Sequence, residues 1–231
     1  MTLALVAAIA IVAAFLSRER TPKYQDRREA QRPELMLLTS LPIVFPERFA
    51  LDAAASPTLD ALKGRYQVRP ISVADTASLE GHRLLLMAQP RAQPPEMLVE
   101  LDSWVRGGGR VLVLADPALQ WPSDRPLGDA LRPPIAFADT GLLEHWGLRI
   151  AAPAKLGTQT MTAGGQDVRT LSPGTLHAIG ANCRTEGEFA ARCAIGRGRV
   201  TVIADADFID SHRFGEGNLQ PLFAELAALE Q

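Results

Sequence analysis

The chain is poor in cysteine and in aromatic residues, and its charges nearly cancel. Of 231 residues only two are cysteine, 6% are aromatic, and the formal net charge at pH 7 is −2. A balanced charge gives no attraction to a polyanion, and so few aromatic side chains offer no stacking platform for bases. The composition therefore argues against nucleic acid as a partner. The hydrophobic share of 47% is sufficient for a globular core.

The short motifs of common catalytic chemistry are also missing. The sequence has no Gly-x-Ser-x-Gly elbow, no Gly-Lys-Ser/Thr phosphate loop and no Cys-x-x-Cys pair. These absences weigh against a hydrolase, a nucleotide-binding protein and a zinc protein, and we expect neither a cofactor nor enzymatic activity. Ordinary surface or boundary positions are expected for the four histidines, which share no metal-ligand spacing: His82, His145, His177 and His212.

The N-terminal apolar run is short for a membrane span. Residues 3–16 carry no charge, and the segment that follows them is dense in charge. A helix over residues 1–17 would reach only about 25 Å at about 1.5 Å per residue, against a hydrocarbon core of about 30 Å. We interpret residues 1–17 as a short membrane anchor, 18–33 as a charged linker and 34–231 as an α/β domain. A cleaved signal peptide and a buried globular helix are the alternatives for the anchor.

Two features disagree about the side of the membrane on which the domain lies. Basic residues follow the apolar run, and the positive-inside rule would hold them in the cytoplasm. Against this, Cys183 and Cys193 stand in "NCRTEGEFAARC", which can double back to form a disulfide, and a disulfide implies an oxidising compartment. Two unpaired thiols are the alternative. We expect a single-pass inner-membrane protein whose soluble domain is periplasmic.

Strands and helices alternate after the linker. The stretch "PPEMLVELDSWVRGGG" has apolar residues at helical spacing and ends at Gly107, and it joins two apolar strands, "RLLLMAQP" and "RVLVLADP". Two such strands joined by one helix imply a parallel, right-handed crossover. Around Gly196-Arg197-Gly198 two further β runs meet in a predicted hairpin. Residues 151–181 have a weak pattern, and "DVRTLSP" is the strand expected there.

Polar residues follow the ends of the predicted strands, where ligands bind in open parallel sheets. Asp116, Asp205 and Asp207 are among these residues. Their three carboxylates would suit magnesium or calcium, with His212 as a further ligand. The alternative, which we prefer, is that the acids bond to backbone N–H groups of the turns that follow the strands, so that the sequence assigns no metal site. The candidate ligand-binding residues at these strand ends are Ser40, Gln89, Asp116, Asp205 and Asp207.

A proline-rich loop from Asp116 to Thr140 contains Trp121. An aromatic residue in such a loop is either tucked beneath it or offered to a partner. Trp121 is therefore our candidate for a partner-binding surface.

Four segments, taken in order, resemble one known family. They are "LLLMAQP" with "LDSWVRGGGRVLVLADP", then "LLEHWGLRI", then "GRGRVTVIADADF", then "GNLQPLFAEL". The match covers roughly Glu34 to Leu229 and resembles the GldG-like auxiliary domain of ABC transport systems, with related small membrane-anchored bacterial proteins of unassigned function. The resemblance implies a flavodoxin-like three-layer α/β sandwich with a mostly parallel central sheet, similar to class I glutamine amidotransferases without their catalytic residues.

The resemblance also implies a role through protein contacts. We expect a non-enzymatic, membrane-anchored accessory domain of an ABC-type transport or envelope-assembly system, with an ABC permease or ATPase as partner. The alternative is a small-ligand or metal-binding domain, or a degenerate hydrolase, that uses the acids at the edge of the sheet.

Overall fold

A seven-stranded sheet forms the centre of the molecule. The computed structural model describes residues 24–45 and 56–231. The strand order is β2-β1-β3-β4-β11-β10-β9. Five of these strands are parallel, and their order is the doubly wound order of flavodoxin-like sheets. The parallel strands are β1 (Glu34–Thr39), β2 (Gln67–Ile71), β3 (Leu84–Ala88), β4 (Arg110–Leu114) and β11 (Gly198–Ile203).

Two antiparallel strands extend this sheet at one edge. The chain turns tightly between β10 (Ala190–Ile195) and β11, which confirms the predicted hairpin, and β9 (Cys183–Glu186) pairs with β10. Glycine is required in this turn, because a Cβ at Gly198 would lie 2.0 Å from the main-chain oxygen of Val105. The hairpin therefore passes directly over the end of a helix.

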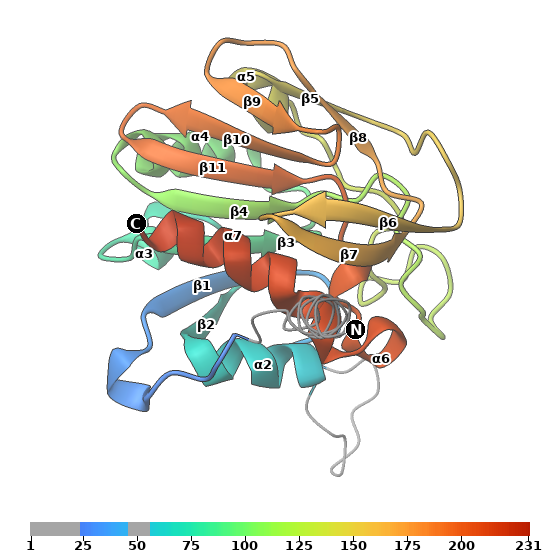
Figure 1. The fold of residues 1–231 in the computed structure, drawn as a ribbon. Coiled ribbons are helices and arrows are strands. Elements are labelled where there is room, and N and C mark those ends of the chain that lie inside the picture. Colours follow the sequence, from blue (N-terminus) through green and yellow to red (C-terminus); the bar gives the residue numbers. More distant parts are fainter. Residues whose placement is uncertain (1–23, 46–55) are drawn as a thin grey trace, which may run out of the picture.

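Helices cover both faces of the sheet, so the sheet is the middle of three layers (Figure 1). One face carries α2 (Pro57–Arg65) and α7 (Gln220–Glu230). The other carries α3 (Thr76–Leu79), α4 (Pro95–Arg106) and α5 (Leu142–Trp146). The short remaining helices are η1 (Glu29–Gln31), η2 (Asp207–Ile209), α6 (Ser211–Phe214) and η3 (Glu216–Leu219).

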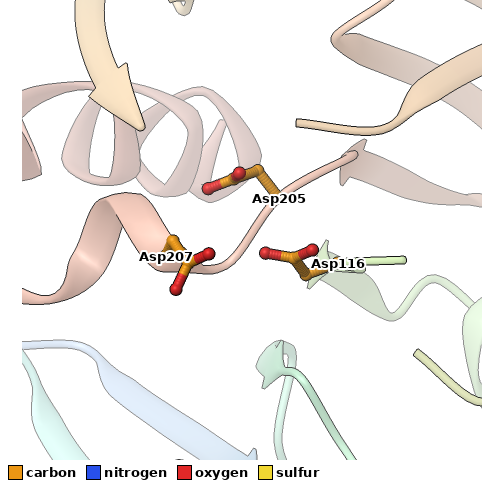
Figure 2. Close-up of side chains that lie close together, drawn as sticks. All are labelled: Asp116, Asp205 and Asp207. Atoms are coloured by element: carbon orange, nitrogen blue, oxygen red, sulfur yellow. The ribbon is translucent and has the colours of Figure 1, made fainter. Parts of the chain in front are cut away.

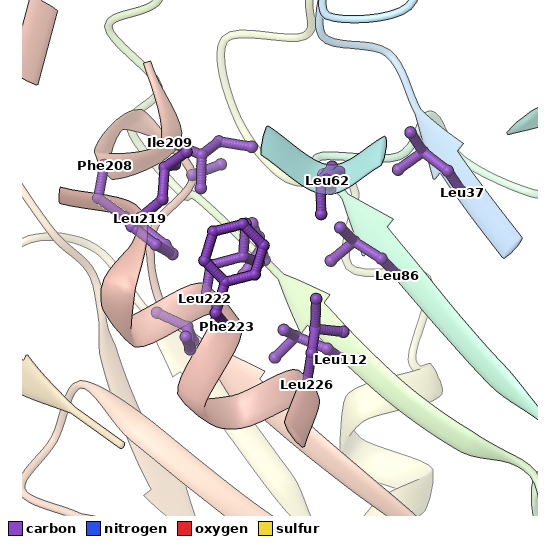
Figure 3. Packing of buried hydrophobic residues seen from close by; sticks show 14 of the residues in the cluster. Leu37, Leu62, Leu86, Leu112, Phe208, Ile209, Leu219, Leu222, Phe223 and Leu226 are labelled. Atoms are coloured by element: carbon purple, nitrogen blue, oxygen red, sulfur yellow. The ribbon is translucent and has the colours of Figure 1, made fainter. Parts of the chain in front are cut away.

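Alternating strand residues supply two separate cores, one on each face. On the α7 face, Leu37, Leu86 and Leu112 of three neighbouring strands share one core with Leu62 of α2 and Leu226 of α7, as Figure 3 shows. The residues between them in sequence point the other way and pack beneath α4 and α5. Both faces of the strands are thus buried, as expected for a parallel sheet between helices.

Two small antiparallel pairs lie outside the main sheet. One consists of β5 (Leu148–Ala151) and β8 (Thr175–Ala178), and the other of β6 (Thr158–Ala163) and β7 (Gln166–Leu171). The β6–β7 hairpin packs against α7 through Ala163 and Val168. Only β7 of the hairpin was expected, because the Thr-rich and Gly-rich sequence alternates too weakly to mark β6.

Cys183 and Cys193 form a disulfide between β9 and β10. The two residues are directly opposite in the antiparallel register, and their Cα atoms are 4.0 Å apart. In the chain-entropy model a crosslink across so short a loop stabilises a fold by about 3 kcal/mol. The bond holds the outermost strand of the sheet in place.

The end of the predicted linker packs on the domain. Tyr24 lies against Phe223 of α7, with ring centroids 5.9 Å apart. Arg27 forms an ion pair with Glu230 at 2.9 Å, and its backbone N–H donates to the oxygen of Gly64. From Tyr24 onward this segment is therefore part of the folded unit.

The predicted fold class included an N-terminal membrane helix, and that part is corrected. Residues 1–17 lie outside the described residues. Within residues 24–45 and 56–231, no helix is long and apolar enough to cross a membrane. The fold that the structure describes is a mixed α/β domain with a seven-stranded, mostly parallel sheet.

Candidate functional site

Strand register brings Asp116 and Asp205 together. Leu114 of β4 pairs with Ile203 of β11, and each aspartate stands two residues beyond its strand. Parallel strands end at the same edge of a sheet, so the two carboxyl groups become neighbours. Asp207 begins η2 immediately after this edge. Each of the three side chains places an oxygen within 4.8 Å of the others, and all three are fully buried (Figure 2).

Backbone N–H groups hold part of this acidic cluster, which we define as Asp116, Asp205 and Asp207. Asp116 accepts through Oδ1 from the N–H of Ala118 at 2.8 Å and through Oδ2 from that of Ala206 at 3.1 Å. Two backbone bonds fix this carboxylate in one orientation. The bond to Ala118 caps the turn that follows β4, whereas the bond to Ala206 joins the ends of β4 and β11.

In Asp205 and in Asp207, only one of the two carboxylate oxygens accepts a hydrogen bond. Asp205 Oδ1 accepts from Thr170 Oγ1 at 2.5 Å and from the N–H of Phe208 at 3.0 Å. Asp207 Oδ2 accepts from the N–H of Gln120 at 2.8 Å. Among the residues that the structure describes, Asp205 Oδ2 and Asp207 Oδ1 have no hydrogen-bond partner, although both are buried. The structural role therefore accounts for only part of the cluster.

Burial raises the pKa values of all three acids, and the charge of Asp116 raises those of Asp205 and Asp207 further. Burial raises the pKa of Asp116 to about 6. Burial, together with the charge of Asp116, raises the pKa of Asp207 to about 7. The same two causes hold the pKa of Asp205 well above its ordinary range. Near neutral pH the cluster therefore binds protons that it would release in the unfolded chain.

Gln89 joins the ends of β3 and β4 with its side-chain amide. Its Nε2 donates to the main-chain oxygens of Asp116 at 3.0 Å and Pro134 at 3.3 Å, and its Oε1 accepts from the N–H of Asp116 at 2.9 Å. Gln89 is fully buried and has a φ of 45°, in the left-handed region. Since these bonds occupy the amide, Gln89 orients Asp116 and the loop.

Ser40 lies apart from the acidic cluster, in a cleft of about 620 Å³. Its hydroxyl donates to the main-chain oxygen of Gln89. The cleft is outside the carboxyl ends of β1 and β2, beside the point where the strand order reverses, which is the usual ligand position in such sheets. Phe45 and Leu131 are among its lining residues and are 69% and 58% exposed.

The other predicted candidates do not join either site. Trp121 is half-buried and packs against the core beneath the proline-rich loop, so it is tucked in. His212 is exposed on α6 and is not part of the acidic cluster. Sequence reasoning missed Thr170, Gln120 and the cleft-lining Phe45 and Leu131, because their positions depend on contacts between distant segments.

One family of transport proteins matches more than half of the chain. Residues 32–163 match the model of a family described as "ABC-type uncharacterized transport system". No curated protein matches. These 132 matched residues run from before β1 to the end of β6 and contain both β4 and the proline-rich loop.

Two solved structures are similar in fold. The mmIFT52 N-terminal domain is 12% identical, with a TM-score of 0.51 over 84% of this chain and 97% of that one. The cytoplasmic protein STM1381 from Salmonella typhimurium LT2 is 11% identical, with a TM-score of 0.51 over 85% and 99% of the two chains. At this identity the likeness concerns the fold alone.

The predicted location as a single-pass inner-membrane protein with a periplasmic domain is also corrected. Within residues 24–45 and 56–231 no helix is long and apolar enough to cross a membrane. The prediction rested on the apolar run at residues 3–16, which lies outside the described residues.

Proposed function

We propose, on the premise that the chain belongs to the ABC-type uncharacterized transport system family, that it is a non-enzymatic accessory module which binds a permease or an ATPase of that system. The observation that carries the proposal is the family match over residues 32–163. The matched segment includes Arg91, Gln93 and Leu131, which line the cleft. The cleft is therefore the surface on which we place the partner.

The side-chain contacts support a role without catalysis. Both cysteines are in the disulfide and supply no thiolate. The Ser40 hydroxyl donates to a main-chain oxygen, and the Thr170 hydroxyl donates to the Asp205 carboxylate. In the described part of the chain, neither hydroxyl has a histidine base beside it, as an activated nucleophile would require. Raised pKa values in the acidic cluster do not indicate catalysis here, since its carboxyl groups are fully buried.

Exposed apolar residues at the cleft support protein binding. Phe45 and Leu131 present large hydrophobic side chains at the same opening. Leu127 and Ile135, also in the proline-rich loop, are 74% and 59% exposed. Large exposed apolar residues at one opening, as Phe45 and Leu131 are, typically mark a contact with another protein. Pocket-filling apolar anchors carry much of the affinity of such contacts.

Affinity purification tests this proposal. The full chain, tagged at its C-terminus, is expressed in its native cells and recovered after gentle detergent solubilisation, and bound proteins are identified by mass spectrometry. We expect an ABC permease or ATPase to be recovered. Phe45→Ser with Leu131→Ser should lower that recovery by at least about tenfold, because two apolar contacts are lost.

A matched double variant serves as the control. Val99→Ser with Leu156→Ser changes two apolar side chains that are 67% and 82% exposed but do not line the cleft. This variant should recover the partner as the unmodified chain does. Equal recovery with both variants would exclude the cleft, and the absence of any transport component from the unmodified chain would contradict the accessory role.

A further inference from the structure

We propose that the acidic cluster of Asp116, Asp205 and Asp207 is a binding site for a divalent cation, with Ca²⁺ as the preferred ion. This inference is independent of the accessory role. It rests first on geometry, because each of the three side chains brings an oxygen within 4.8 Å of the other two. Figure 2 shows the three carboxyl groups drawn together from the end of β4 and from the segment that follows β11.

Two unused oxygens are the second observation. Asp205 Oδ2 and Asp207 Oδ1 are buried without a hydrogen-bond partner among the described residues. A buried oxygen without a partner is unfavourable, and more so if it is charged, so proteins rarely leave one without a role. A cation bound in the cluster would supply the partner that these carboxyl groups lack. The other oxygens of these two side chains are held by Thr170, Phe208 and Gln120, which orients the carboxylates in advance.

The charges of the acidic cluster also favour a bound cation. Three buried carboxyl groups carry up to three negative charges, and no ion pair reaches any of them from the residues that the structure describes. Arg213 is the cation whose charge acts on Asp207, but its guanidinium lies 3.9 Å from Asp210 and donates to the main-chain oxygen of Gln120. A divalent cation would neutralise two of the three charges and remove most of the repulsion between them.

Burial of the acidic cluster favours Ca²⁺ over Mg²⁺. Calcium binds about six to eight oxygen ligands at about 2.3–2.6 Å in a flexible geometry. Magnesium demands near-ideal octahedral geometry at about 2.0–2.1 Å and usually keeps several of its waters. Three fully buried carboxyl groups suit the ion that gives up its waters more readily. An all-oxygen ligand set excludes the softer metals that prefer thiolate or imidazole.

Thermal unfolding and calorimetry of the full chain test the site. After treatment with EDTA and its removal at pH 8, addition of 5 mM CaCl₂ should raise the melting temperature by about 5 °C, as expected for a dissociation constant of about 0.1 mM. Asp205→Asn with Asp207→Asn should abolish the shift and the heat of binding. Both substitutions remove buried charge, so this variant should still fold.

Asp210→Asn is the matched control. Asp210 is a neighbouring buried acid whose side chain caps α6, and it is not part of the acidic cluster. This variant should keep the calcium response. The site is overturned if neither Ca²⁺ nor Mg²⁺ gives heat or a thermal shift, or if Asp205→Asn with Asp207→Asn responds as the unmodified chain does. A larger response to Mg²⁺ than to Ca²⁺ would overturn the assignment of calcium.

Discussion

Replacing Gln89 by alanine is expected to lower the free energy of unfolding by about 3 kcal/mol. The change removes three hydrogen bonds and leaves the backbone N–H of Asp116 buried without a partner. The main-chain oxygen of Asp116 keeps one bond, from the N–H of Phe137, so the loss is partial. Chemical denaturation monitored by circular dichroism measures the effect.

Two comparison variants show whether the amide is responsible. Gln67→Ala alters an exposed glutamine whose single side-chain bond is to the oxygen of Arg32, and it should change stability by no more than about 0.5 kcal/mol. Gln89→Glu retains the shape but places an oxygen against the carbonyl oxygen of Asp116, so it should destabilise nearly as much as Gln89→Ala. If Gln89→Ala were as stable as Gln67→Ala, the role given to this amide would be wrong.

The stability of the chain in EDTA should fall as the pH rises from about 4 to about 8. The pKa values of Asp116 and Asp207 are raised to about 6 and about 7, and that of Asp205 is raised well above its ordinary value. Raised carboxyl pKa values mean that the folded state binds protons which the unfolded state has released. Their favourable contribution is therefore complete below about pH 4, the unfolded value, and is lost as pH rises through the folded pKa values.

Substitution of Asp207 isolates this contribution. Asp207→Asn should be about 4 kcal/mol more stable than the unmodified chain at pH 8, which is about 8–16 °C in melting temperature, and nearly equal to it at pH 4. The neighbouring charges on Asp207 come from Asp116, Asp210 and Arg213, and they are unchanged in the variant. Thermal melts of both proteins across this range test the prediction. If the melting temperatures of the two proteins changed in parallel with pH, Asp207 would not be the source of the pH dependence.

Other carboxylates act in the opposite direction at lower pH. Ion pairs or hydrogen bonds lower the pKa values of Glu34 and Asp102, so the stability that these groups supply is lost as pH falls through their folded values. The unmodified chain should therefore be most stable near pH 4, where the two opposite dependences meet. Glu34 and Asp102 are present in both proteins, so their effect cancels in the difference in stability between Asp207→Asn and the unmodified chain.

The edge of the sheet was predictable from sequence because it depends on periodicity. Buried apolar runs end at Asp116 and Asp205, and the carboxyl ends of parallel strands must meet at one edge. The hairpin at Gly196–Gly198 was similarly marked by local turn chemistry. Short-range signals of this kind located both acids before any contact was known.

The details of the site depend on long-range contacts. The backbone N–H of Gln120 reaches Asp207 across 87 residues. Thr170 reaches Asp205 from a hairpin whose first strand, "TQTMTA", has few apolar residues to mark it in the sequence. Leu131 is exposed, whereas Trp121 is half-buried. This difference depends on the path of a loop that contains little regular structure. No single stretch of sequence carries this information.

The most direct test of the central claim, that the cleft binds a transport component, is site-specific photo-crosslinking in native cells. A photoreactive phenylalanine analogue is placed at position 131 in the cleft and, as a control, at position 156, where the leucine is 82% exposed outside it. We predict a crosslinked ABC permease or ATPase, identified by mass spectrometry, from position 131 and none from position 156. A crosslink to a transport component from position 156 alone, or from neither position, would contradict the account.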